Sequence, residues 1–280
     1  MNELELKAAQ TLIELALRED VGDGDITTDN IIPAETRRKA KMVAKADGVV
    51  AGLPVAEMVF RSLDQQLFWN VLTPEGSRVK KGDVMVEFEG TYRALLTGER
   101  TALNFLQRMS GIATMSAKYA DAVKDFKTVI LDTRKTLPGF RMLDKYAVKT
   151  GGASNHRIGL YDMAMIKDNH IEVAGGITKA VNAVRSNIKP GIQIEVETTT
   201  LAQVQEAIDA GADIIMLDNM NTETMKKGVE LIAGRAKVEA SGNMTLERLR
   251  EVAATGVDFI SIGALTHSVS ALDISQRLED

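Results

Sequence analysis

The sequence has no cysteine, no long apolar run and no excess of positive charge. Without cysteine among its 280 residues, the chain forms no disulfide and offers no thiolate to a metal, which is compatible with a reducing compartment. The first twenty residues are rich in glutamate and lack the basic start and apolar core of a secretory signal, and no other stretch is apolar over a membrane-spanning length. These absences predict a soluble, cytoplasmic protein.

The charge balance argues against nucleic acid as a partner. The formal net charge is −5 and the pI is near 5.4, whereas general nucleic-acid binding requires a basic surface. The content of hydrophobic residues, 45%, and of charged residues, 26%, is that of a globular protein. A chain of this length folds as one α/β barrel or as two domains.

The first part of the chain predicts a small α+β domain. Apolar residues at helical spacing over 4–18 predict an amphipathic helix. Short alternating segments between 39 and 90 predict strands, with a helix over 55–63 between them. A longer helix is expected over 92–126, interrupted at Ser110-Gly111.

From residue 128 onward the pattern alternates apolar strand and helix. This alternation predicts a TIM-like α/β barrel, with an open, doubly wound sheet as the alternative. The expected strands cover residues 128–132, 163–167, 192–197, 213–218, 236–241 and 258–262, and helices are expected over 201–210, 222–232 and 246–254.

Basic side chains follow the apolar strands at the points where these end. They are Arg134, Lys135, Arg157 and Lys167. In α/β folds the carboxyl ends of the strands form the ligand-binding rim, so this cluster predicts an anionic ligand with several carboxylates or phosphates. The alternative is a solvated basic loop.

Carboxylates and small residues end the later strands. Glu197 and Asp218 follow neighbouring strands, where they suit a hard cation or serve as helix N-caps. Two small-residue turns, Ser241-Gly242 and Gly263-Ala264, follow the next strands and predict a phosphate site, because glycine lets backbone N–H groups approach a ligand.

Strand parity makes a further prediction about the barrel interior. Residues of equal parity on a strand face the same way. If Glu197 and Ser241 face inward, then Glu195, Lys237 and Glu239 are charged residues inside the barrel. Because buried charges must be paired, Lys237 is predicted to bridge to Glu195 or Glu239, unless a register break turns it outward.

These motifs together resemble the quinolinate phosphoribosyltransferase family over essentially the whole length. They are REDVGDGDITT (18–28), ERTALN (99–104), DTRKTLP (132–138), GGASNHR (151–157), KDNH (167–170), EVE (195–197), LDN (217–219), EASG (239–242) and GALTHS (263–268). The resemblance implies an N-terminal α+β sandwich (1–110), an incomplete TIM-like barrel (111–265), a tail returning to the first domain (266–280), and a homodimer that uses Mg²⁺. Asn243 stands where many relatives have glycine.

The resemblance also implies roles for individual residues. The carboxylates of quinolinate would be bound by Arg134, His156 and Arg157, with Arg100 contributed by the partner subunit. Lys135 and Lys167 would serve the diphosphate and the reacting centre. The remaining implied contacts are ribose and Mg²⁺ at Glu197 and Asp218, and phosphate at Ser241, Gly242, Gly263 and Ala264.

The implied activity is transfer of a phosphoribosyl group from phosphoribosyl diphosphate to quinolinate, with decarboxylation, in NAD biosynthesis. Two alternatives remain at this point. One is a transferase of the same fold that acts on another heteroaromatic carboxylate. The other is a non-catalytic module that binds phosphosugars.

Overall fold

The computed structural model describes residues 1–279, which form two compact units. Unit 1 comprises Met1–Ala117, Thr136–Gly152 and the residues from Leu265 onward. Unit 2 comprises Lys118–Lys135 and Ala153–Ala264. Each unit is therefore assembled from segments that are separated in the sequence.

The first half of the chain contributes strands and helices mainly to unit 1. In chain order these are α1 (Glu3–Val21), α2 (Thr28–Ile31), β1 (Arg37–Ala44), β2 (Gly48–Val49), α3 (Leu53–Leu63), β3 (Phe68–Val71), β4 (Arg78–Val79), β5 (Val84–Thr91) and α4 (Tyr92–Ala122).

The second half alternates strand and helix as the sequence predicted. Its elements are β6 (Val129–Leu131), α5 (Arg141–Thr150), β7 (Ala164–Ile166), α6 (Asp168–Ala174), α7 (Ile177–Asn187), β8 (Ile194–Thr198), α8 (Leu201–Asp209), β9 (Ile214–Asp218), α9 (Thr222–Ile232), β10 (Lys237–Ser241), α10 (Leu249–Ala253), β11 (Phe259–Ser261), α11 (Ala264–His267) and β12 (Ile274–Leu278).

Unit 1 is built on a four-stranded sheet in the order β12-β1-β5-β3. The inner face buries an aromatic cluster, in which the Phe88 ring lies 5.1 Å from that of Phe60 and 5.0 Å from that of Trp69. The C-terminal strand β12 completes the sheet by pairing antiparallel with β1. Residues near both ends of the sequence therefore stabilise the same sheet.

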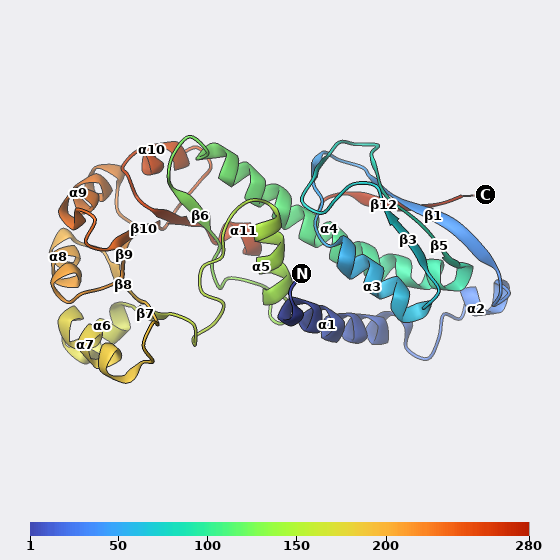
Figure 1. Cartoon of the computed structure of the whole chain (residues 1–280), viewed down its shortest axis with the longest axis horizontal. Helices are drawn as coiled ribbons and strands as arrows, with labels where there is room; N and C mark the ends of the chain where they lie inside the picture. The colour runs from blue at the N-terminus through green and yellow to red at the C-terminus, as the bar shows by residue number, and fades with distance from the viewer. Residues whose placement is uncertain (280) are drawn as a thin grey trace. The chain divides into compact units, whose positions relative to one another are not determined.

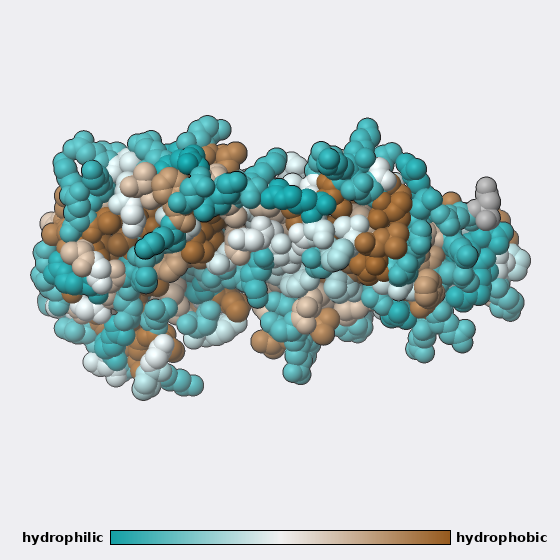
Figure 2. Space-filling model, turned by 45° about the horizontal axis from the view of Figure 1, so that its top comes forward, coloured by the Kyte–Doolittle hydropathy of each residue, from teal (hydrophilic) through white to brown (hydrophobic). Residues whose placement is uncertain are grey.

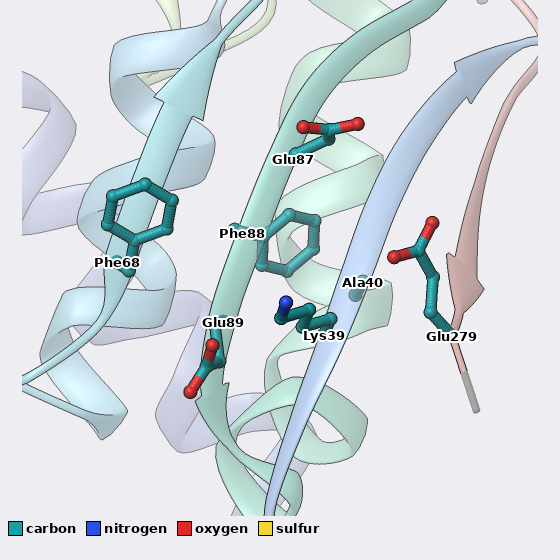
Figure 3. Close-up of a pocket in the computed structure, with 7 residues that line it drawn as sticks. All are labelled: Lys39, Ala40, Phe68, Glu87, Phe88, Glu89 and Glu279. Atoms are coloured by element: carbon teal, nitrogen blue, oxygen red, sulfur yellow. The ribbon is translucent and has the colours of Figure 1, made fainter.

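The outer face of this sheet is polar. Figure 3 shows a depression on unit 1 whose lining includes Lys39 on β1 and Glu87 and Glu89 on β5. Lys39 and Glu89 are direct cross-strand neighbours, and opposite charges in this position support the strand pairing. The depression contains none of the residues that the sequence predicted for the functional site.

Helix α4 runs without interruption from Tyr92 to Ala122, so the expected break at Ser110-Gly111 is wrong. The Ser110 hydroxyl bonds to the backbone of Ala51, from which it accepts an N–H at 3.0 Å. A side chain at Gly111 would collide with the backbone carbonyl oxygen of Ser270. These small residues let neighbouring backbone approach the helix, and they do not end it.

Helix α5 belongs to unit 1, whereas the expected ranges placed it with the barrel. It packs against α1 and is joined to α4 by a buried ion pair. The Arg108 guanidinium donates two hydrogen bonds to the carboxylate of Asp144, at 3.1 and 2.8 Å, and the Asp144 side chain is fully buried. Burial raises the pKa of Asp144, and Arg108 opposes this shift.

We expect Arg108→Met to lower the urea midpoint by leaving this carboxylate unpaired, at a cost of about 3–5 kcal/mol. Adding Asp144→Asn should recover part of the loss, because it removes the buried charge. Lys227→Met serves as the control, because its ion pair with Glu223 is exposed on α9 and should leave the midpoint unchanged. A double variant no more stable than Arg108→Met would show that the unpaired charge is not the cause.

Unit 2 contains a six-stranded parallel sheet in the order β6-β11-β10-β9-β8-β7. Helices α7 to α10 lie outside the curved sheet (Figure 1), and the strands bury apolar residues toward them, such as Val196 and Ile215. Within residues 1–279 the ladder stays open between β6 and β7. The expected incomplete TIM-like barrel is therefore confirmed, and all six predicted strands are present.

Hydrophilic residues cover most of the visible face, with small apolar patches between them (Figure 2). Among the described residues, no helix has the length and apolar character needed to cross a bilayer.

Candidate active site

The carboxyl ends of the parallel strands in unit 2 gather nearly all of the predicted site residues on one edge. Because parallel strands end at the same side of a sheet, residues that follow β6, β11, β10, β9, β8 and β7 line one rim. The residues on it, in that order, are Arg134 and Lys135, Gly263 and Ala264, Ser241 and Gly242, Asp218, Glu197, and Lys167.

A lysine and two carboxylates lie at the ends of β7, β8 and β9. The Lys167 ammonium donates to a carboxylate oxygen of Glu197 at 2.7 Å, and the Glu197 side chain is only 18% exposed. Asp218 ends the neighbouring strand and accepts a hydrogen bond from the Asn219 amide at 2.6 Å. The two carboxylates therefore follow adjacent strands and provide oxygen ligands of the kind that Mg²⁺ prefers.

A tight turn follows β10. Gly242 has a φ of +87°, and a side chain there would collide with Asn219. Asn219 itself has a φ of 55° and donates its backbone N–H to the carbonyl of Ser241 at 3.0 Å. Asn243, which stands where many relatives have glycine, also adopts a positive φ of 49°.

The segment with His156 and Arg157 is attached to the end of β6. Ser154 forms a parallel bridge with Leu131, and the carboxylate of Asp132 accepts the backbone N–H of His156 at 2.8 Å. Asp132 is fully buried. This attachment brings His156 and Arg157, which no strand carries, to the same edge as the other candidates.

The Arg157 guanidinium is held by two hydrogen bonds. It donates one hydrogen bond to the Met163 carbonyl at 3.1 Å and another to the Met165 sulfur at 3.7 Å. Burial lowers the pKa of Arg157, and the positive charge of Arg134 adds to this effect. Two guanidinium groups that interact electrostatically suit a ligand with more than one carboxylate.

Below this edge lies a buried acidic pair that contradicts one sequence prediction. Glu195 and Glu239 are both fully buried, as parity required. Lys237 does not bridge to them: its ammonium pairs with Asp258 at 2.7 Å, and its side chain is 59% exposed. Their partner is His156, whose Nε2 lies 3.1 Å from Glu195 and 3.4 Å from Glu239.

Burial and the neighbouring charges shift the pKa of His156 and of Glu195. Burial alone lowers the pKa of His156, but hydrogen bonds and charges from both carboxylates raise it to about 10. Burial raises the pKa of Glu195 to about 7. Nδ1 of His156 accepts the backbone N–H of Arg157 at 2.7 Å, and a second ring proton on Nδ1 would abolish this hydrogen bond. We therefore assign a neutral ring whose proton lies on Nε2, toward the two carboxylates.

Arg100 is the one candidate on a different unit. It lies exposed on α4 in unit 1, next to Glu99. Burial raises the pKa of Glu99, and the charge of Arg100 opposes the shift. The structure therefore makes Arg100 accessible to another molecule.

The sequence did not predict roles for Asp132, Asn219 or the pair Glu195 and Glu239. Asp132 and Asn219 occur in the motifs noted above, but neither side chain has a recognisable ligand spacing. The parity of β8 and β10 placed both glutamates inside the barrel, yet gave no indication that a loop histidine would pair with them. The loop that carries His156 reaches the barrel through the bridge between Ser154 and Leu131, which is visible only in the structure.

This combination defines a class of protein, an α/β barrel enzyme for anionic substrates, and comparison with known proteins defines the family. Models of the quinolinate phosphoribosyl transferase N-terminal and C-terminal domains match residues 25–110 and 112–277. The chain is 48% identical to a probable nicotinate-nucleotide pyrophosphorylase (carboxylating) of Synechocystis, over 94% of this chain and 90% of the relative. A Bacillus subtilis relative with the same name is 46% identical, over 98% and 94%.

Solved structures agree with these sequence comparisons. The crystal structure of NadC from Streptococcus pyogenes matches with a TM-score of 0.93 and 41% identity, and the match covers 97% of each chain. The chain belongs to the quinolinate phosphoribosyltransferase family. The resemblance stated from the sequence motifs is thereby confirmed.

Proposed function

We propose that the chain is a pentosyltransferase of NAD biosynthesis. It transfers the phosphoribosyl group of phosphoribosyl diphosphate to quinolinate and releases CO₂ and diphosphate, leaving nicotinate mononucleotide. The observation that carries this proposal is the single edge of unit 2, at which the guanidinium groups of Arg134 and Arg157 gather with lysines and strand-end carboxylates. The family and the names of the relatives support the same activity.

Arg134 and Arg157 bind the two carboxylates of quinolinate, with His156 beside them. Burial, and then repulsion from Arg134, lowers the pKa of Arg157, and a bound dianion would offset that repulsion. Planar guanidinium groups also match carboxylates in a bidentate geometry. The ring nitrogen of quinolinate is thereby aimed at the ribosyl carbon.

Lys135 and Lys167 bind the departing diphosphate. Lys135 follows β6, where its backbone N–H donates to the Thr133 hydroxyl at 3.1 Å. Lys167 is positioned by its hydrogen bond to Glu197. Phosphate oxygens of phosphoribosyl diphosphate lie against the two small-residue turns, Ser241-Gly242 and Gly263-Ala264, because small residues let a ligand approach the main chain closely.

Glu197 and Asp218 fit Mg²⁺ by donor chemistry, because both present carboxylate oxygens at adjacent strand ends. They would hold the ion together with ribose hydroxyls, and the ion would supply positive charge to the leaving diphosphate. Two protein carboxylates would leave room for water and substrate oxygens around the ion, as is usual for Mg²⁺.

The reaction follows from the charges at this edge. As the bond between the ribosyl carbon and diphosphate breaks, Lys135 and Lys167 stabilise the departing negative charge. The pyridine nitrogen forms the new bond to that carbon. The bond to the adjacent carboxylate then breaks, its electron pair passes to the pyridinium ring, CO₂ leaves, and the ring carbon takes up a proton. The protein contributes positioning and the exclusion of water.

A coupled assay tests the proposal. Quinolinate and phosphoribosyl diphosphate should yield CO₂ and diphosphate in equal amounts. Diphosphate from another heteroaromatic carboxylate, with none from quinolinate, would indicate a related transferase instead. Binding of phosphoribosyl diphosphate with no turnover of any such carboxylate would indicate a module that only binds phosphosugars.

The metal assignment makes its own prediction. Chelation by EDTA should abolish activity and Mg²⁺ should restore it, and Asp218→Asn should require a higher Mg²⁺ concentration because a neutral amide is a weaker ligand. Asp209→Asn on the exposed face of α8 is the control and should keep the wild-type requirement. Full activity of the wild-type protein in metal-free buffer would remove Mg²⁺ from the mechanism.

The family resemblance further supports a homodimer with shared sites. Arg100 of each subunit contributes to quinolinate binding at the strand ends of its partner. Its exposure on α4 is compatible with that role. A twofold dimer then contains two composite sites.

A further inference from the structure

Glu195 and Glu239 have no part in the proposed chemistry, yet both are fully buried beneath it. They project from β8 and β10, the strands that flank β9. A buried carboxylate is costly unless it is paired. The ring of His156 is the ion-pair partner found for both carboxylates within residues 1–279.

The other ring nitrogen of His156, Nδ1, also has a partner. Nδ1 of His156 accepts the backbone N–H of Arg157 at 2.7 Å. Because an accepting nitrogen carries no hydrogen, the proton lies on Nε2, between the two carboxylates. The ring therefore links two barrel strands to the main chain of a residue proposed to bind substrate.

The tautomer of His156 decides whether the cluster of His156, Glu195 and Glu239 is suited to a metal ion or to a hydrogen-bonded proton. One histidine and two glutamates, with ligand atoms within 4.8 Å of one another, could also hold a metal ion. A neutral histidine ligand must present a lone pair on Nε2 and a hydrogen on Nδ1 to an acceptor. Here Nδ1 faces an N–H donor, so the cluster is arranged around a proton and not around a metal.

The main chain on either side of the ring is also restrained. Asp132 accepts the N–H of His156 at 2.8 Å, and the Arg157 guanidinium donates to the Met163 carbonyl at 3.1 Å. The ring of His156 contacts Glu195 and Glu239 on one side and the backbone N–H of Arg157 on the other. The position of the ring therefore restrains the backbone of Arg157.

We propose that Glu195 and Glu239 are positioning residues for quinolinate recognition, which act through His156 on Arg157. The inference rests on the proposed function, because the expected effect of the two glutamates is on the binding of quinolinate. It also gives His156 a different part in that site: both of its ring nitrogens serve the protein, and Arg157 makes the contact with the substrate.

Steady-state kinetics of Glu239 variants test this role. Glu239→Leu removes one of the two carboxylates that face Nε2 of His156 and should raise the KM for quinolinate on the order of tenfold to a hundredfold. The KM for phosphoribosyl diphosphate should stay near the wild-type value. Glu239→Gln keeps an acceptor oxygen and resembles a protonated carboxyl, so it should restore most of the quinolinate affinity. Glu223→Leu on the exposed face of α9 is the matched control, expected to behave as wild type.

Nitrogen-15 NMR of the imidazole rings gives a readout that does not depend on activity. The chain has only three histidines, so His170→Gln and His267→Gln variants assign the signals. We expect His156 to show a protonated Nε2 and an unprotonated Nδ1, both in wild type and in Glu239→Gln. This measurement remains decisive if Glu239→Leu fails to fold.

Several results would overturn the inference while leaving the proposed function intact. They are a wild-type quinolinate KM in folded Glu239→Leu, equal damage from Gln and Leu at this position, and a ring protonated at Nδ1. A shift of the His156 signals on addition of Zn²⁺ or Mg²⁺ alone would instead establish a metal site. Failure of the proposed function itself is distinguishable, because the wild-type protein would then not turn over quinolinate.

Discussion

Arg100→Ala and Lys135→Ala should each be nearly inactive alone and should regain about a quarter of wild-type activity when mixed in equal amounts. Re-equilibration makes half of the dimers mixed. In a mixed dimer with shared sites, one site carries both substitutions and the other carries neither. A quarter of all sites is then intact. Both side chains are exposed, so the substitutions should not disturb folding.

A double variant provides the matched control for the mixing experiment. Arg100→Ala mixed with the Arg100→Ala/Lys135→Ala double variant should recover nothing, because every site then lacks Arg100. Subunit exchange is verified separately with differently tagged chains. If exchange occurs and the first mixture remains inactive, Arg100 acts within its own chain or has no role in the site.

Arg157→Ala should lower kcat/KM for quinolinate, because it leaves a carboxylate of the bound substrate without its partner. The corresponding loss of transition-state stabilisation is on the order of 3–5 kcal/mol. Arg157→Lys should recover little of this loss. A lysine ammonium is a point charge and cannot replace the planar fork, which here also donates to the Met163 carbonyl and the Met165 sulfur.

Arg185→Ala is the control for the Arg157 series. Arg185 lies on α7 in the same unit, and its ion pair with Asp213 is partly exposed, so its loss should leave kcat/KM unchanged. Quinolinate turnover at the wild-type level in Arg157→Ala or in Arg157→Lys would remove Arg157 from the dicarboxylate site.

The strands of unit 2 were predictable because their sequences carry the physical signal themselves. A run such as Ile214–Asp218 is apolar on both faces, as a strand between barrel interior and outer helices must be. The polar residue that ends each run then falls on the carboxyl edge. The edge position of Lys167, Glu197 and Asp218 therefore followed from local pattern, and the motifs around them indicated the family.

The expected helix break at Ser110-Gly111 was wrong because it was based on local sequence alone. Serine and glycine weaken a helix in isolation, and the sequence alone therefore favoured a break. In the folded chain the Ser110 hydroxyl binds the backbone of Ala51, and Gly111 leaves room for the backbone of Ser270. Tertiary packing outweighs a propensity of this size.

The sequence by itself determined which residues of β8 and β10 enter the barrel, because side chains alternate along a strand. It could not determine what pairs with Glu195 and Glu239. Lys237 has the right parity, but it begins β10, at the end of the strand away from the site, and there its flexible side chain reaches Asp258 and solvent. His156 takes its place only because the bridge to β6 brings a distant loop to the barrel. Pairing of buried charges depends on distance in space, which only the tertiary structure sets.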